Sequence, residues 1–283
     1  MSPARFSRRQ FLLAGGATTA VLAVGGIGLW RELLRGTSPP KYPHLKPGPL
    51  VSGSFHSKYR HQEVGWTISY PPGHAVGSAL PVSLVLHGYD ANHETAFSDL
   101  YLQDAQAQFV NGHPIPPIVL AAVDGGNTYW HRRTVGDDPV GMLVHEFLPL
   151  LHRRGLVTER VDVLGWSMGG YGALLFGETH PHLVKRIAAE SPAIWPSYWA
   201  SQGANPTAFD SAADWQDNSV LGHIRDLIGI PVRVDCGESD PFLFASQDLA
   251  RLLPAGSVHF EPGGHSERFW EARGRAQLRF LTT

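Results

Sequence analysis

The chain has 283 residues, enough for one large α/β domain with a substantial core. Charged residues make up 17% of the chain and apolar residues 43%, which is typical of a globular protein, and the formal net charge of -2 gives no reason to expect a nucleic-acid partner. The 15 histidines are scattered, and neither an H-E-x-x-H motif nor a paired-cysteine spacing is present, so we predict no metal site.

An export signal is predicted at the start of the chain. Residues 7–13 read Ser-Arg-Arg-Gln-Phe-Leu-Leu, which matches the twin-arginine pattern, and the run from Phe11 to Trp30 carries no charge. Two outcomes are open for this segment: cleavage after the small residues near Ala23, or retention as a membrane anchor. The second is possible because about 20 uncharged residues can span a bilayer. We therefore expect residues 1–35 to direct the protein to the periplasm, the cell envelope or the medium.

A proline-rich linker is expected to precede the folded domain. Residues 36–49 contain five prolines, which favour an extended chain. The domain itself is predicted to span residues 50–283.

Strand and helix patterns alternate along this domain. Strands are predicted at 64–70, 82–86, 118–123, 161–164, 187–190, 232–235 and 258–260, and helices at 92–110, 142–151, 168–176, 244–253 and from about 267 onward. This alternation predicts an α/β fold with a mostly parallel central sheet flanked by helices. Residues 192–229 interrupt the rhythm with several tryptophans and are expected to form a small cap insertion over the site.

A nucleophile elbow is predicted between the strand at 161–164 and the helix that follows it. Gly165, Ser167 and Gly169 have the G-x-S-x-G spacing, which places a serine in a strained turn at the edge of a sheet. The two glycines have no Cβ to collide with the neighbouring backbone. We expect Ser167 to be the nucleophile and the Met168 N–H, at the start of the helix, to bind an oxyanion.

The loop after the predicted strand at 82–86 is expected to supply the second oxyanion donor. Gly88 lets a substrate carbonyl approach the backbone, and the Tyr89 N–H is the candidate donor. His87 is expected to form hydrogen bonds within this loop rather than to act as a base.

Two further places are predicted to contact substrate. Asp124 and Trp130 lie in the Gly-rich loop after the strand at 118–123, and Trp195 opens the cap segment. In one interpretation these side chains line the substrate site. In the other, Asp124 caps a turn and Trp130 packs beneath the loop, and Trp195 belongs to the small core of the cap.

A base and an acid complete the predicted site. A serine needs a base within hydrogen-bond reach and an acid to orient that base. Ser167, Asp240 and His265 occur in the chain order of an α/β-hydrolase triad, each just past a predicted strand. Glu238 is the rival of Asp240 because it lies only two residues earlier.

These motifs resemble those of the esterase D and secreted-mycolyltransferase branch of the α/β-hydrolases. The resemblance rests on the His87-Gly88 loop, the loop at 124–126, the elbow at 165–172, the turn at 236–240 and the sequence Gly-Gly-His265. It implies the α/β-hydrolase fold, carboxylester hydrolysis or acyl transfer, no cofactor, and catalytic roles for Ser167 and His265. The mycolyltransferases use a glutamate as the acid, so Asp240 favours a simple esterase.

We therefore predict an exported serine esterase that acts on a small-molecule or lipid ester. The alternatives are an acyltransferase to a sugar or lipid alcohol and a non-catalytic binding protein of the cell surface. The last alternative predicts a damaged triad, whereas all three residues are present here.

Overall fold

The computed structural model describes residues 45–110 and 113–283. These residues belong to one compact unit, Pro39–Thr283. The predicted signal or anchor segment, 1–35, and the first part of the predicted linker lie outside the described residues. In the two described ranges, no helix is both long enough and apolar enough to cross a membrane.

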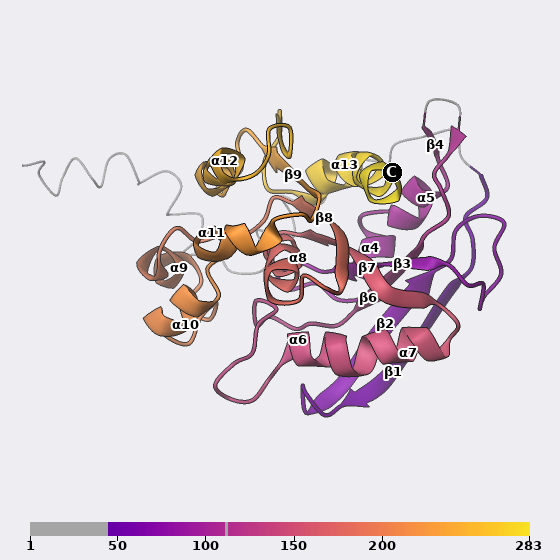
Figure 1. The fold of residues 1–283 in the computed structure, drawn as a ribbon, viewed down its shortest axis with the longest axis horizontal. Helices are drawn as coiled ribbons and strands as arrows, with labels where there is room; N and C mark the ends of the chain where they lie inside the picture. The colour runs from indigo at the N-terminus through magenta and orange to yellow at the C-terminus, as the bar shows by residue number, and fades with distance from the viewer. Residues whose placement is uncertain (1–44, 111–112) are drawn as a thin grey trace, which may run out of the picture. The chain divides into compact units, whose positions relative to one another are not determined.

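One mixed sheet of eight strands forms the centre of the described structure, in the order β1-β2-β6-β3-β7-β8-β9-β10 (Figure 1). Its strands are β1 (Leu50–Ser57), β2 (Gln62–Ser69), β3 (Pro81–Leu86), β6 (Val119–Val123), β7 (Val157–Trp166), β8 (Val184–Glu190), β9 (Val232–Gly237) and β10 (Val258–Glu261). The pairs β1–β2 and β2–β6 are antiparallel, and every later pair is parallel. The predicted, mostly parallel sheet is confirmed. A separate antiparallel pair consists of β4 (Phe109–Val110) and β5 (His113–Pro114).

Helices cover both faces of the sheet, and others lie in the connection between β8 and β9. The helices of the described residues are α4 (Thr95–Ser98), α5 (Leu102–Gln106), α6 (Pro139–Met142), the π-helical turn η1 (Leu143–Phe147), α7 (Leu148–Arg153), α8 (Met168–Thr179), α9 (Tyr198–Ala204), α10 (Ala212–Asp217), α11 (Val220–His223), the short 3₁₀ turn η2 (Ile224–Leu227), α12 (Leu243–Leu252) and α13 (Glu267–Thr282). Buried side chains of α4, α5 and α13 form one apolar cluster with the sheet, and those of η1, α7, α8, η2 and α12 form another.

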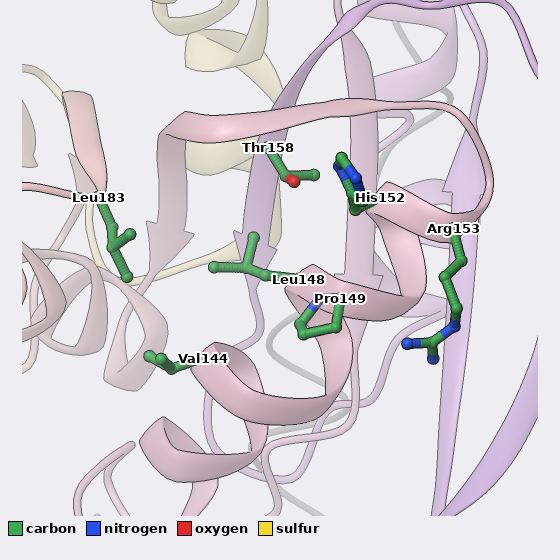
Figure 2. Close-up of a pocket in the computed structure, with 7 residues that line it drawn as sticks. All are labelled: Val144, Leu148, Pro149, His152, Arg153, Thr158 and Leu183. Atoms are coloured by element: carbon green, nitrogen blue, oxygen red, sulfur yellow. The ribbon is translucent and has the colours of Figure 1, made fainter.

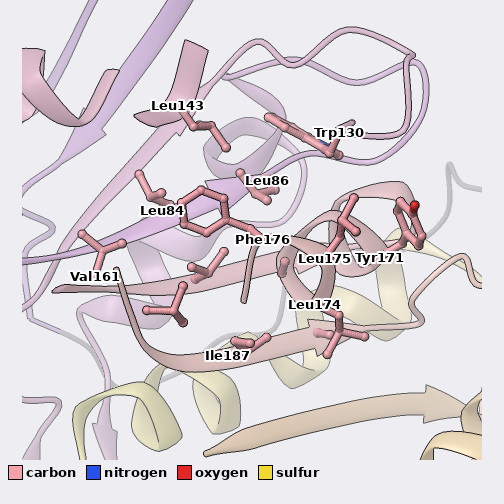
Figure 3. Packing of buried hydrophobic residues seen from close by; sticks show 14 of the residues in the cluster. Leu84, Leu86, Trp130, Leu143, Val161, Tyr171, Leu174, Leu175, Phe176 and Ile187 are labelled. Carbon is pink, nitrogen blue, oxygen red and sulfur yellow. The ribbon is translucent and has the colours of Figure 1, made fainter. Parts of the chain in front are cut away.

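The two clusters follow from the alternation of side chains along each strand. Leu84 of β3 belongs to the cluster with α8, whereas its neighbour Val85 belongs to the cluster with α13. Figure 3 shows Leu84, Leu86 and Phe176 gathered in the first cluster. Because both faces are buried, the central strands are continuous apolar runs, and this is why they could be predicted.

The predicted strands are all present, most of them longer than predicted. The strand predicted at 161–164, for example, spans Val157–Trp166. β1 was not predicted, because this edge strand reads Leu-Val-Ser-Gly-Ser-Phe-His-Ser and is mostly exposed. Its sequence therefore lacks the apolar alternation that marks a half-buried strand.

The single helix predicted at 92–110 is wrong. The structure has two short helices, α4 and α5, followed by β4. Tyr101, between the helices, has a φ of 49° and lies in the left-handed region, which breaks the helical path. The apolar spacing of this segment comes from two short helices whose buried side chains join one apolar cluster, not from one long helix.

The segment at 192–229 connects β8 to β9 and contains α9, α10, α11 and η2. It is fastened to the rest of the domain by polar contacts. The Tyr171 hydroxyl of α8 donates to the Asn218 carbonyl over 2.7 Å. The Arg133 guanidinium, in the loop after β6, donates from Nε to the Asp210 carboxylate over 3.1 Å.

Substitution of Gly169 is expected to disrupt the packing of α8 against the sheet. A Cβ at Gly169 would collide with the backbone carbonyl of Leu86 and lie 2.7 Å from that of His87. We expect Gly169→Ala to lower the free energy of unfolding by about 3 kcal/mol, measured by urea denaturation. Gly203 of α9 has open space at its Cβ position, so Gly203→Ala should be neutral or stabilise by up to about 1 kcal/mol. Equal stability of the two variants would contradict this account of α8.

Candidate functional site

Ser167 lies in a strained turn between β7 and α8. Its φ of 55° and ψ of -119° are unfavourable for a residue with a side chain. The Ser167 N–H donates to the Glu190 carbonyl over 2.8 Å, and the Ser167 carbonyl accepts from the Ala193 N–H over 2.9 Å. The end of β8 and the connection that follows it thus hold the strained backbone on both sides, which fits a nucleophile elbow.

The glycines of the elbow allow very close backbone contacts. A Cβ at Gly165 would collide with the Gly169 carbonyl, and a Cβ at Gly170 would lie 2.9 Å from the Glu190 carbonyl. Gly172 packs against Trp130, with a Cβ position 2.6 Å from the indole Cγ. Side chains at these positions would push α8 away from the sheet and move Ser167.

The structure brings Ser167, His265 and Asp240 together. The Ser167 Oγ lies 2.8 Å from His265 Nε2, and His265 Nδ1 lies 2.9 Å from Asp240 Oδ2. Because a carboxylate only accepts, His265 Nδ1–H donates to Asp240, and Nε2 is left to accept the serine proton. The Asp240 side chain is fully buried, and the His265 side chain is 9% exposed.

Asp240 and not Glu238 holds the histidine. Asp240 follows β9 in a tight turn, its N–H donates to the Gly237 carbonyl over 3.0 Å, and its Oδ1 accepts from the Phe242 N–H over 2.8 Å. The carboxylate is therefore anchored before it meets His265. Glu238 is exposed, and Asp240 is the acid in contact with the base.

Two aromatic rings contact the imidazole of His265. Phe242 lies 5.3 Å from it and Trp270 4.9 Å, measured between ring centroids. Neither ring was assigned to the site from the sequence, although Phe242 is only two residues after Asp240. Its position two residues after Asp240 is the one sequence feature that could have placed Phe242 in the site.

The loop after β3 lies beside Ser167. A Cβ at Gly88 would lie 3.4 Å from the Ser167 Cβ and 2.8 Å from Trp166 Nε1. Within the described ranges, no protein acceptor takes a hydrogen bond from the N–H of Met168 or of Tyr89. These two N–H groups therefore remain the candidate donors to an oxyanion.

His87 stabilises this loop. It is buried, its Nδ1 is 2.7 Å from the Gly88 carbonyl, and its Nε2 accepts from the Gly125 N–H over 2.8 Å. Burial lowers the pKa of His87 to about 4, so the ring is neutral near pH 7. The prediction that His87 forms hydrogen bonds within the loop is confirmed, and the ring also joins this loop to the one after β6.

Asp124 and Trp130 serve the structure of their loop. The Asp124 carboxylate accepts from the backbone N–H groups of Gly65 and His93 over 3.0 and 2.8 Å. Trp130 is only 1% exposed, and its Nε1 donates to the His87 carbonyl over 3.1 Å. Trp130 therefore cannot line an open substrate site, and that interpretation is wrong. An aromatic residue in a Gly-rich loop has the same sequence pattern whether its ring points outward or into the core.

Trp195 lies at the edge of the site. Its indole is half-buried and meets the Phe242 ring edge to face, with centroids 4.9 Å apart. Its Nε1 donates to the Tyr129 hydroxyl over 3.3 Å. Of the aromatic side chains expected to contact substrate, Trp195 is the one placed next to the residues around His265.

The described residues contain no group of three or more His, Cys, Asp or Glu side chains arranged to hold a metal ion. An open, mostly apolar hollow of about 360 Å³ lies elsewhere, beside α7 and the start of β7 (Figure 2). It is lined by Val144, Leu148, Pro149, His152, Arg153, Thr158 and Leu183. Thr158 is at the opposite end of β7 from Ser167, so we do not assign this hollow to the chemistry.

Comparisons with known proteins identify the family of this chain. Residues 57–278 match the model of the family described as "Putative esterase", and the chain belongs to this family of serine hydrolases. No match was found among curated proteins.

Solved structures share the fold, and the α/β-hydrolase prediction is confirmed. A ferulic acid esterase superposes with a TM-score of 0.71 at 20% identity, covering 83% of this chain and 98% of that one. The fluorophosphonate-binding serine hydrolase FphF of Staphylococcus aureus gives 0.67 at 17% identity, with coverages of 84% and 100%. An S-formylglutathione hydrolase from Agrobacterium tumefaciens gives 0.65 at 15% identity, with coverages of 87% and 99%.

His87 predicts a loss of stability in acid. Its pKa falls from the ordinary 6.5 to about 4 on folding, so between these values the unfolded chain binds a proton that the folded chain does not. Above about pH 6.5, His87 therefore has no effect on the free energy of unfolding. As the pH drops from about 6.5 to below about 4, His87 lowers the free energy of unfolding by roughly 3 kcal/mol in total.

The variant His87→Gln isolates this effect. A glutamine amide has a donor for Gly88 and an acceptor for Gly125 but does not titrate. Urea unfolding at about pH 7 and about pH 4 should show that the wild type loses roughly 3 kcal/mol more than the variant. An equal loss in both proteins would show that His87 does not remain neutral in the fold.

Proposed function

We propose that this member of the esterase family is an exported enzyme that cleaves carboxylic esters through Ser167, His265 and Asp240. The observation that carries the proposal is the unbroken chain of hydrogen bonds from Ser167 Oγ to His265 and on to Asp240, with lengths of 2.8 and 2.9 Å. A serine is a weak nucleophile near neutral pH, and a base in this position activates it.

In the proposed mechanism, Ser167 Oγ attacks the ester carbonyl while His265 Nε2 takes its proton. The Met168 and Tyr89 N–H groups donate to the oxyanion of the tetrahedral intermediate, a contribution of about 2.7–4 kcal/mol for each donor in comparable sites. The intermediate then collapses, the bond to the alcohol oxygen breaks, and His265 protonates that oxygen. Water, deprotonated by His265, finally attacks the acyl-enzyme, the bond from the acyl carbon to Ser167 Oγ breaks, and His265 returns the proton to Ser167 as the acid is released. No cofactor takes part.

Asp240 has two roles in this mechanism. It fixes the proton on His265 Nδ1, so that Nε2 faces the serine, and it stabilises the imidazolium that forms in each half-reaction. Its anchoring by the Phe242 N–H supports the first role, because a fixed carboxylate fixes the ring.

The substrate class is proposed only as far as the carboxylic ester. The solved structures with this fold include a ferulic acid esterase and an S-formylglutathione hydrolase, whose names differ in substrate. We infer the shared reaction, hydrolysis of an acyl bond, and not either substrate. A small-molecule or lipid ester remains the proposal.

Acyl transfer to a sugar or lipid alcohol would use the same residues. It differs only in whether an alcohol or water attacks the acyl-enzyme. A binding protein without catalysis, in contrast, has no need of the strained serine or of the hydrogen bond from His265 to Asp240. These features favour an enzyme.

The catalytic proposal predicts large and unequal losses of activity. With p-nitrophenyl esters of graded chain length, Ser167→Ala should lower kcat roughly a million-fold. Asp240→Asn should lower it about ten-thousand-fold, because the amide no longer holds His265 in the required tautomer.

Two neighbouring residues provide matched controls. Ser239 and Glu238 are exposed on the same turn as Asp240, so Ser239→Ala and Glu238→Gln should keep the kcat of the wild type. Full activity in Ser167→Ala, or a loss in Glu238→Gln as large as in Asp240→Asn, would contradict the assignment.

Export is proposed from the sequence alone, since residues 1–35 lie outside the described part of the chain. Replacing Arg8 and Arg9 by lysine should keep the folded esterase inside a bacterial host, measured as activity in cytoplasmic and exported fractions. The same change at Arg31 and Arg35 is the control and should not affect export. The mass of the exported wild type then distinguishes cleavage near Ala23 from an intact membrane anchor.

A further inference from the structure

The order of the strands divides the site into two sides. Ser167 follows β7, which lies between β3 and β8. Tyr89, a proposed oxyanion donor, follows β3 on one side. His265 and Asp240 follow β10 and β9 on the other side, and Trp195 comes from the connection after β8.

The chemistry then assigns one side to the alcohol part of the ester. In the tetrahedral intermediate the oxyanion must point toward its N–H donors, and the alcohol oxygen must meet the proton on His265 Nε2. The substituent on that oxygen therefore leaves along the His265 side of the site.

Phe242 and Trp195 are two partly exposed aromatic residues on this side, and ring contacts connect them to His265. Phe242 lies 5.3 Å from the His265 ring, and Trp195 lies 4.9 Å from Phe242, measured between centroids. Trp270 also contacts His265, but it is only 6% exposed and cannot reach a ligand. We call the pair of Phe242 and Trp195 the aromatic wall.

Hydrogen bonds and ring contacts hold the aromatic wall in place, and its indole N–H is occupied. Trp195 Nε1 donates to the Tyr129 hydroxyl, and the Trp195 carbonyl accepts from Trp215 Nε1 over 3.2 Å. The Phe242 N–H is bonded to Asp240. The wall therefore offers ring carbons to a ligand, and little side-chain freedom is lost when one binds.

We propose that the aromatic wall binds the alcohol part of the substrate and selects esters of flat, aromatic alcohols. The inference rests on the proposed function, because it takes His265 as the group that protonates the alcohol. An aryl ring can pack edge to face or offset on Phe242 and Trp195, as aromatic rings do on one another.

The test compares the benzyl and ethyl esters of one acid, because the acyl-enzyme is then the same and the two alcohols have similar intrinsic reactivity. The wild type should show a higher kcat/KM for the benzyl ester. Phe242→Leu and Trp195→Leu keep apolar bulk but remove the ring, and each should lower the benzyl-to-ethyl ratio of kcat/KM about five- to tenfold.

The chain offers a matched control for each variant. Phe244 and Trp199 are 78% and 79% exposed, and each lies a few residues beyond its partner in the wall. Phe244→Leu and Trp199→Leu should leave the benzyl-to-ethyl ratio unchanged. Because the readout is a ratio, a general loss of activity through a displaced His265 does not imitate the expected result.

Three outcomes would overturn the proposal. The wild type could hydrolyse both esters equally well, the wall variants could lower both rates by one factor, or they could change the preference for acyl chain length instead. The last result would assign the wall to the acyl group. Each of these leaves the proposed function intact, whereas undiminished hydrolysis by Ser167→Ala would remove the function itself.

Interception of the acyl-enzyme gives a second measurement. By microscopic reversibility, an attacking alcohol occupies the place of the leaving alcohol. Benzyl alcohol should therefore divert the acyl-enzyme from a p-nitrophenyl ester more efficiently than ethanol does, with the product ratio measured by chromatography. Phe242→Leu should reduce this advantage, and equal diversion by both alcohols in the wild type would contradict the aromatic wall.

Discussion

The backbone of Ser167 is held in a conformation that it would not adopt alone, and the geometry of the site depends on that restraint. A positive φ at a residue with a side chain costs free energy, which the surrounding structure must supply. Here Glu190 at the end of β8 and Ala193 after it supply this free energy through hydrogen bonds to the N–H and the carbonyl of Ser167. The close contact of Gly165 with Gly169 then sets how near α8 lies to the sheet, and so where the hydroxyl points.

Buried polar groups connect the loops next to the elbow to one another. His87 joins the loop after β3 to the loop after β6 through Gly88 and Gly125. Glu190, whose carbonyl accepts from the Ser167 N–H, has a buried side chain, and burial raises the pKa of its carboxyl group well above the ordinary value. A raised pKa favours the neutral carboxyl group, which places less negative charge behind the elbow, where an oxyanion is proposed to form.

Much of the fold could be predicted because its signals are local. The central strands are runs of buried apolar residues, and the elbow is a strand, a G-x-S-x-G turn and a helix in succession. The order of Ser167, Asp240 and His265, each after a strand, predicted that they would meet, because parallel strands end at one edge of a sheet. The break in the helix predicted at 92–110 could not be predicted, because the positive φ of Tyr101 does not change the spacing of apolar residues in the sequence.

The alternation of strands and helices, the elbow, and the candidate nucleophile and base could thus all be predicted from local patterns. The choice of Asp240 over Glu238, the burial of Trp130 in the core, and the placement of Phe242 and Trp195 near His265 depend on the folded arrangement. The physical reason is that spacing along the chain reports which strand end a residue occupies. The direction in which its side chain points depends on contacts with residues from distant parts of the chain, which no local pattern records.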